Sequence, residues 1–217
     1  MQAVQSEVDV HLEFLLEEPS AEAVLRTILP KILSGNTSSD FFVFKGKEHL
    51  LKQLPERLKT YRQWIPDDWR IIVLIDEDRG DCHELKAYLE RAAHEAGFVT
   101  KSSAAPDEDF RVVNRLAIEE LEAWFFGDVE ALHTAYPRIP KTLQYQRKYR
   151  NPDAIQGGTY EALERLLIRQ NYFRERIPKP TVAQNIAQHM EPSRNRSRSF
   201  QVFVEGLKAC VGEELLV

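Results

Sequence analysis

The stretch that decides the fold is Arg70-Ile71-Ile72-Val73-Leu74-Ile75-Asp76-Glu77-Asp78-Arg79-Gly80-Asp81, in which an apolar run ends abruptly in clustered carboxylates. Residues 71–75 are apolar throughout, a pattern typical of a strand buried on both faces in the middle of a parallel sheet. Because side chains alternate along a strand, we expect Asp76 and Asp78 to point the same way and Glu77 to point the other way. The sequence therefore predicts two neighbouring carboxylates at the carboxyl end of a central strand, where open α/β sheets bind ligands.

Two interpretations of these acids are open. Like charges held close together repel each other, and a hard divalent cation such as Mg²⁺, which prefers oxygen ligands, would neutralise them. Alternatively, acids after a strand line a solvated turn or cap the next helix. Asp81 fits the second description, since residues 82–96 have helical spacing and Gly97 is a typical helix terminator.

Length and composition describe an ordinary globular protein. The 217 residues suit one domain, or one domain with a small appendage, and 43% of them are hydrophobic and 29% charged. The net charge of -5 argues against a general nucleic-acid coat protein but not against local contact with a phosphate backbone. The sequence offers neither a membrane span nor a signal peptide, and its cysteines, Cys82 and Cys210, form no metal-type pair, so we expect a cytoplasmic protein with free thiols.

Strand and helix patterns alternate along the first 128 residues. This alternation predicts an α/β fold with a mostly parallel central sheet flanked by helices. The expected strands are residues 8–16, 41–44, 71–75, 98–102 and 110–118, and the expected helices are residues 21–33, 48–64, 81–96 and 119–127.

The first of these strands also ends in acid, at Glu17 and Glu18. On the helix predicted for residues 119–127, Glu122 falls within the apolar stripe, so it needs a partner. That partner is either a metal ion or an arginine such as Arg115, in which case Glu122 is a buried structural carboxylate.

Residues 129–217 read as a helical C-terminal extension packed on the core of residues 1–128. Within this extension, Arg194, Arg196 and Arg198 alternate with small polar residues. Such a loop either grips phosphates or is a solvated hinge, and the pattern does not decide between the two.

Several motifs resemble the Toprim fold, the metal-dependent core shared by topoisomerases, primases and the overcoming-lysogenization-defect nucleases. These are the acid that ends the first strand (Glu17), the later Asp-x-Asp (Asp76 and Asp78) and the inward Glu122. Three longer stretches are more similar to one bacterial group, the family called domain of unknown function 4276. They are Phe14-Leu15-Leu16-Glu17-Glu18-Pro19-Ser20-Ala21-Glu22, Glu122-Ala123-Trp124-Phe125-Phe126-Gly127-Asp128 and Ser197-Arg198-Ser199-Phe200.

The Toprim resemblance implies site residues and a cofactor. Glu17 would take part in acid/base chemistry or bind metal, although Glu18 stands where the family usually has Gly, and Asp76 and Asp78 would bind Mg²⁺ or Mn²⁺. Glu122 matches the later acidic position of the family. Candidates for the basic residue that family nucleases use are Lys179, Arg194 and Arg196, and Arg198 joins the arginines expected to hold a nucleic-acid backbone.

The function that follows is a divalent-metal-dependent nuclease acting on DNA or RNA. The alternative is a non-catalytic Toprim-like subunit that binds nucleic acid or a partner protein. The chain has no Gly-x-x-x-x-Gly-Lys-Ser/Thr loop, so any ATP dependence would come from a separate ATPase partner. A role in phage defence is implied by the resemblance alone.

Overall fold

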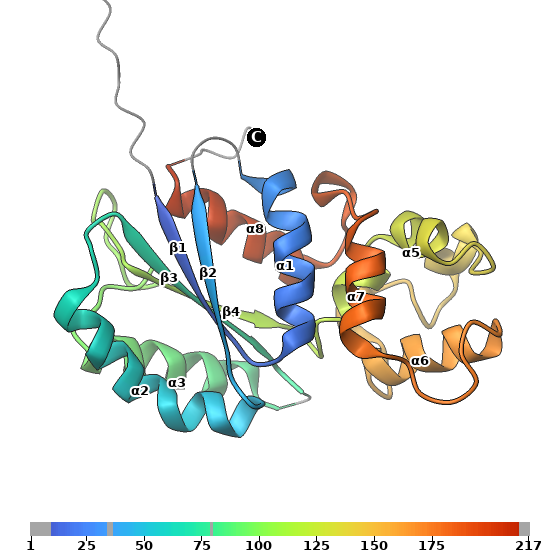
Figure 1. Ribbon diagram of the computed structural model, residues 1–217, viewed down its shortest axis with the longest axis horizontal. Coiled ribbons are helices and arrows are strands. Elements are labelled where there is room, and N and C mark those ends of the chain that lie inside the picture. Colours follow the sequence, from blue (N-terminus) through green and yellow to red (C-terminus); the bar gives the residue numbers. More distant parts are fainter. Residues whose placement is uncertain (1–9, 34–36, 79, 213–217) are drawn as a thin grey trace, which may run out of the picture.

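The computed structural model describes residues 10–33, 37–78 and 80–212, which form an α/β fold around one sheet. The four strands are all parallel and lie in the order β2-β1-β3-β4, so the predicted parallel sheet flanked by helices is confirmed (Figure 1). The strands are β1 (His11–Leu16), β2 (Ser38–Val43), β3 (Trp69–Asp76) and β4 (Val112–Ala117). The helices are α1 (Pro19–Ile32), α2 (Lys47–Trp64), α3 (Cys82–Glu95), α4 (Ala123–Gly127), α5 (Val129–Ala135), α6 (Thr159–Arg169), α7 (Lys179–Ala187) and α8 (Arg198–Cys210).

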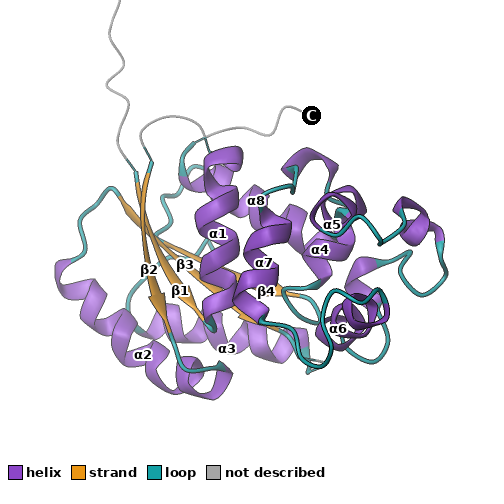
Figure 2. Ribbon diagram, turned by 45° about the vertical axis from the view of Figure 1, so that its right-hand side comes forward, coloured by secondary structure: helices purple, strands orange, loops and turns teal. Residues whose placement is uncertain are grey.

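Helices cover both faces of the sheet. On one face α2 and α3 bury Ile71, Val73 and Ile75 of β3, and on the other α1 and α8 lie over a larger cluster that includes Ile72 and Leu74 (Figures 1 and 2). The apolar run in β3 thus contributes alternate side chains to two cores, as expected for a strand buried on both faces.

The larger of the two cores continues past the sheet into the C-terminal helices. Trp124 of α4 packs edge-on against Phe200 and beside Phe203 of α8, with ring centroids 5.1 and 5.0 Å apart. α7 lies beside α1, while α5 and α6 lie beyond α7, away from the sheet (Figure 2). Residues 129–217, as far as they are described, are therefore helical and packed on the core.

Two helix caps follow the predicted chemistry. Asp81 accepts hydrogen bonds from the backbone N–H groups of His83 and Glu84, which fixes the start of α3. Gly97 follows the end of that helix with a φ of 83°, a left-handed conformation that glycine adopts without strain.

Three predicted elements need correction. Residues 98–102 do not form a strand, and Thr100 makes only a single bridge to Val112. The strand cannot continue because the chain turns directly after this bridge, with hydrogen bonds between Thr100 and Ser103. The strand predicted at 41–44 runs from Ser38 to Val43. The helix predicted at 119–127 begins only at Ala123. Glu119 has a φ of 61°, a left-handed conformation that is incompatible with a helix starting at this residue. The start of the first predicted strand, at Val8, lies outside the described residues.

Candidate functional site

The strand order creates a switch point between β1 and β3. α1 carries the chain from β1 to β2 over one face, whereas α2 and α3 make the later crossovers over the opposite face. The carboxyl ends of β1 and β3 consequently lie side by side at the place where α/β sheets bind ligands. Glu17 directly follows β1, and Asp76 is the last residue of β3.

Asp76 and Glu17 contact each other at this switch point. The backbone N–H of Asp76 donates to Oε2 of Glu17 over 3.1 Å, and Asp76 itself is only 7% exposed. Burial, reinforced by the charges of Glu122 and Glu17, raises the pKa of Asp76 well above its usual range. Burial also raises the pKa of Glu17 to about 7, against the lowering effect of the hydrogen bond from Asp76.

Glu122 reaches the same region from the segment after β4. It precedes α4, is 1% exposed, and its Oε2 makes no hydrogen bond to any described residue. Its Oε1 lies 3.6 Å from Nζ of Lys179. Burial raises the pKa of Glu122 to about 7 even though the ammonium of Lys179 lowers it. A buried carboxylate with an unpartnered oxygen is costly, and a cation would relieve that cost.

Lys179, the first residue of α7, is the predicted basic residue that the structure brings to these acids. Its ammonium donates to Oε1 and Oε2 of Glu18 over 2.8 and 3.0 Å. Burial lowers the pKa of Lys179, but the carboxylates of Glu122 and Glu18 outweigh it and the net shift is upward. Glu18 thus holds Lys179 beside Glu122.

Asp78 lies at the open side of the cluster. β3 ends at Asp76, and Asp78 has a φ of 55°, so the strand alternation does not extend to it. Its side chain is 45% exposed and its Oδ2 lies 3.3 Å from Nζ of Lys47. Lys47 also donates to the backbone carbonyls of Asp76 and Glu77 over 2.8 Å each. The charge of Asp78 contributes to the raised pKa of Glu17.

We refer to Glu17, Asp76, Asp78 and Glu122 as the acidic cluster. Among the described residues, no three of its carboxylates bring one oxygen each within 4.8 Å of the others. A tight cage is not needed for Mg²⁺, which usually keeps several waters and takes only one or two protein carboxylates. The buried carboxylates of Asp76 and Glu122, with Oε2 of Glu122 unpartnered among the described residues, therefore fit a hydrated hard cation.

One family profile, described as domain of unknown function (DUF4276), matches residues 16–208, from the last residue of β1 into α8. The chain belongs to the DUF4276 family. Comparison with curated proteins and with solved structures finds no match. The resemblance to DUF4276 is thereby confirmed, and the wider resemblance to Toprim enzymes stays a prediction.

In this DUF4276 protein the three arginines of the predicted phosphate loop contact partners outside the acidic cluster. Arg194 donates to both carboxylate oxygens of the buried Asp128, over 2.8 and 2.9 Å, and to the carbonyl of His189, near the end of α7 opposite Lys179. Arg198 pairs with Glu205 over 2.9 Å, and Arg196 donates to the carbonyl of Arg150 over 3.3 Å. All three are exposed.

Arg115 is not the partner of Glu122. Its guanidinium instead donates to the backbone carbonyls of Val202 and Asn114, over 3.0 and 2.9 Å, and so joins β4 to α8. If Glu122 is a buried structural carboxylate, its cationic partner is therefore Lys179. The sequence marks Lys179 only as one candidate for the basic residue of a nuclease site and does not predict its partner.

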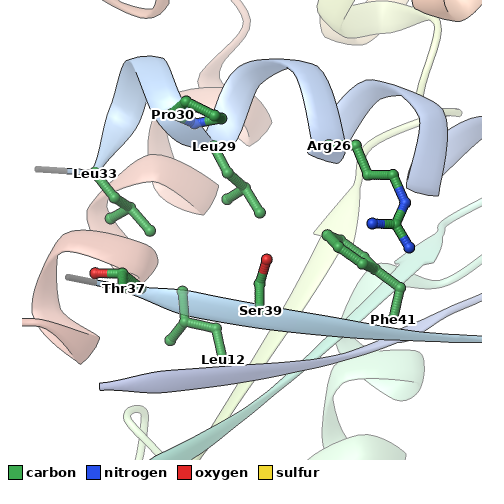
Figure 3. A pocket seen from close by; sticks show the side chains of 8 residues that line it. All are labelled: Leu12, Arg26, Leu29, Pro30, Leu33, Thr37, Ser39 and Phe41. Atoms are coloured by element: carbon green, nitrogen blue, oxygen red, sulfur yellow. The ribbon is translucent and has the colours of Figure 1, made fainter. Parts of the chain in front are cut away.

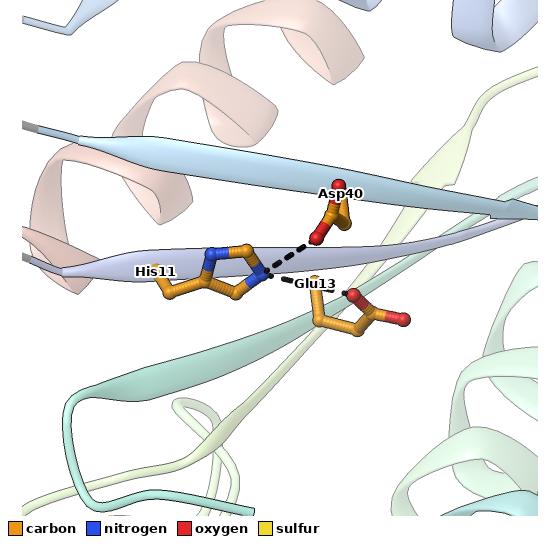
Figure 4. Close-up of side chains that lie close together, drawn as sticks. All are labelled: His11, Glu13 and Asp40. Atoms are coloured by element: carbon orange, nitrogen blue, oxygen red, sulfur yellow. Dashed lines mark ion pairs between the residues drawn. The ribbon is translucent and has the colours of Figure 1, made fainter.

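A second group of ligating side chains lies on β1 and β2, towards the amino ends of these strands. His11, Glu13 and Asp40 bring one ligand atom each within 4.8 Å of the others (Figure 4). No motif in the sequence points to these three residues as a site, although His11 and Glu13 are two residues apart on one strand and so share a face.

The space between α1 and β2 has fewer side chains that could bind a charged ligand. A cavity of about 370 Å³ there is lined by Leu12, Leu29, Phe41 and other residues (Figure 3). The charged residue on its wall, Arg26, lies 4.5 Å above the ring of Phe41 and already pairs with Glu22 over 2.8 Å.

The helices of the described part of the chain include none that is both long and apolar enough to cross a membrane.

Proposed function

We propose that this DUF4276 protein is a divalent-metal-dependent phosphoryl-transfer enzyme, a nuclease that acts on DNA or RNA. The observation that carries the proposal is the grouping of three carboxylates at the switch point of the sheet: the partly buried Glu17 after β1, the buried Asp76 at the end of β3 and the buried Glu122 before α4. One oxygen of Glu122 has no hydrogen-bond partner among the described residues. The positions of Glu17, Asp76 and Asp78 after the first and third strands also support the Toprim resemblance.

In this proposal the acidic cluster holds one or two Mg²⁺ or Mn²⁺ ions through Asp76, Asp78 and Glu17, with Glu122 as a further ligand or as a partner that orients one. A bound divalent ion would supply Lewis-acid stabilisation of the phosphate and a lower pKa for an attacking water.

The chain's own residues would contribute proton transfer and charge. Glu17 would bind the ion or take part in acid/base chemistry with the attacking water, as the Toprim resemblance implies. Lys179 places a positive charge beside Glu122, where it can contact a phosphate oxygen. Arg196 and Arg198 remain candidates for holding the nucleic-acid backbone. Arg194 is less suited to this role, because its guanidinium already donates to both carboxylate oxygens of Asp128. A separate ATPase partner and a role in phage defence enter the proposal through the Toprim resemblance alone.

One observation favours the second candidate, a non-catalytic Toprim-like subunit that binds nucleic acid or a partner protein. Lys179 already neutralises part of the acidic cluster by pairing with Glu18 and lying near Glu122. In that case the fold holds the acids without a divalent ion, and the site has no catalytic use.

Substitution of Asp76 separates the two candidates. Asp76→Asn should lower cleavage of DNA and RNA in Mn²⁺ or Mg²⁺ by roughly 100-fold or more, since it removes a buried ligand oxygen. The matched control is Asp109→Asn, because Asp109 is an exposed aspartate that pairs with Arg70 far from the cluster. Calorimetric titration with Mg²⁺, which the nitrogen ligand of His11 does not suit, should show binding to the wild type and to the control but not to Asp76→Asn. Full cleavage by Asp76→Asn would exclude the proposed enzyme.

A further inference from the structure

We propose that His11, Glu13 and Asp40 form a binding site for a divalent transition-metal ion such as Zn²⁺, separate from the acidic cluster. The pairing of β1 with β2 builds the site, because Glu13 lies directly opposite Asp40 and His11 directly opposite Ser38. Two carboxylates directly opposite each other in neighbouring strands destabilise a sheet unless a cation lies between them. This inference does not depend on the proposed nuclease function.

The distances suit ligands that share a metal ion. Nε2 of His11 lies 3.8 Å from Oε2 of Glu13 and 3.7 Å from Oδ2 of Asp40 (Figure 4). These separations are too long for hydrogen bonds. Tetrahedral ligands bound at about 2.1 Å are separated by roughly 3.4 Å, so both distances from His11 exceed this separation by only a few tenths of an ångström. The ligand atoms of Glu13 and Asp40 lie within 4.8 Å of each other, and the exposed Asp40 side chain can move closer.

His11 is already oriented for this role. Its Nδ1 lies 2.8 Å from Oγ of Ser38, a contact that lets Nδ1–H donate and leaves the lone pair on Nε2. Nε2 is buried and makes no hydrogen bond to any described residue. A metal-binding histidine typically donates its other ring N–H in this way, which fixes the tautomer.

Glu13 has equivalent support. The hydroxyl of Tyr61 donates to Oε1 of Glu13, leaving Oε2 on the side of His11, and Arg57 donates to the Tyr61 oxygen over 3.2 Å. Glu13 is nearly buried, whereas the side chain of Asp40 is 76% exposed and free to adjust. A nitrogen ligand beside two carboxylates suits Zn²⁺ or Co²⁺ better than Mg²⁺, which prefers oxygen ligands alone.

The site opens into a cavity of about 590 Å³ whose lining includes Glu13, Asp40, Arg57, Trp64 and Trp69. The His11 ring lies against Trp69, with centroids 3.7 Å apart. Three protein ligands with one side facing a cavity leave a coordination position for water or a small ligand, the arrangement of zinc sites with an open position.

The competing explanation is that a protonated His11 holds the two carboxylates as ion pairs without metal. Titration of the full chain with Co²⁺ at pH 7.5 tests this, read out by the visible absorption of the bound ion. His11→Ala and Asp40→Asn should each weaken Co²⁺ binding at least 10-fold. Asp40 is exposed, so its variant should fold even if His11→Ala does not.

Two controls locate the ion. His94→Ala removes another histidine that contacts a serine hydroxyl, Ser103, over 2.9 Å, and should bind Co²⁺ like the wild type. Asp76→Asn should also retain this binding even if it loses Mn²⁺-dependent cleavage, which separates failure of this inference from failure of the nuclease proposal. The absence of Co²⁺ binding by the wild type, or unchanged binding by Asp40→Asn, would overturn the inference.

Discussion

At the residue scale, the burial of carboxyl groups sets how this protein responds to pH. Glu122 and Glu17 keep their protons until about pH 7, whereas a carboxyl group in the unfolded chain loses its proton near pH 4.5. Between these values the unfolded state binds fewer protons than the folded state, so the free energy of unfolding falls as pH rises. A divalent cation would oppose that fall, because it binds the ionised carboxylates.

We predict that Glu122→Gln makes stability less dependent on pH. The wild type should lose roughly 3 kcal/mol through Glu122 between pH 4.5 and 8, and the glutamine variant should not, since it cannot ionise. Urea unfolding at pH 5, 6, 7 and 8 measures the difference. The control is Glu130→Gln, an exposed glutamate paired with Lys141, which should follow the wild type. An identical pH profile for Glu122→Gln and the wild type would contradict the buried carboxyl described above.

At the scale of elements, α1 and α7 run side by side in the same direction and are joined at both ends by lysines. Lys179 at the start of α7 binds Glu18 next to the start of α1. Lys31 near the end of α1 donates to the carbonyls of Ala187, Gln188 and Met190 at the end of α7, over 2.7 to 3.2 Å. One lysine neutralises carboxylates and the other satisfies backbone acceptors, so the two should differ in their pH dependence.

We predict that Lys179→Met costs about 2–4 kcal/mol at pH 8, where it leaves Glu18 and Glu122 without their cation. The cost should be smaller at pH 5, because Glu122 is then protonated in the folded state. Lys31→Met is the matched control, and its cost should be similar at both pH values. Equal losses for Lys179→Met at pH 5 and pH 8, measured by urea unfolding, would show that Lys179 does not act through the charge of Glu122.

At the scale of the whole molecule, one hydrophobic core joins the sheet to the C-terminal helices. α8 covers β4, its Phe200 and Phe203 pack on Trp124, and Arg115 of β4 donates to the carbonyl of Val202. The predicted boundary between residues 1–128 and 129–217 therefore divides two segments that contribute buried side chains to the same hydrophobic core.

We predict that a fragment of residues 1–128 does not fold cooperatively, because one face of its sheet would lose the cover of α8. Thermal unfolding should be broad and an apolar dye should bind strongly, in contrast to the intact chain. Co-expression with residues 129–217 should restore a cooperative transition. A sharp transition for residues 1–128 alone would instead establish that segment as an independent domain.

Local patterns in the sequence predicted much of this fold. The apolar run before Asp76, the N-cap at Asp81 and the glycine at position 97 each predict a feature that the structure contains, since burial of a strand and capping of a helix depend on residues close together in the chain. The strand predicted at 98–102 and the helix start predicted at Glu119 are wrong, because the turns at Thr100 and Glu119 depend on contacts that periodicity does not encode.

The sequence by itself determined an alternating α/β chain with acids after the ends of its strands. Only the tertiary structure decided which of these acids are neighbours, because the strand order β2-β1-β3-β4 follows from the packing of helices on both faces. It paired Glu122 with Lys179 rather than Arg115, and it brought Asp40 to His11 and Glu13 through the register of β1 and β2. Such contacts join residues far apart in the sequence, and the free energy that selects them comes from burial of the whole core rather than from any local motif.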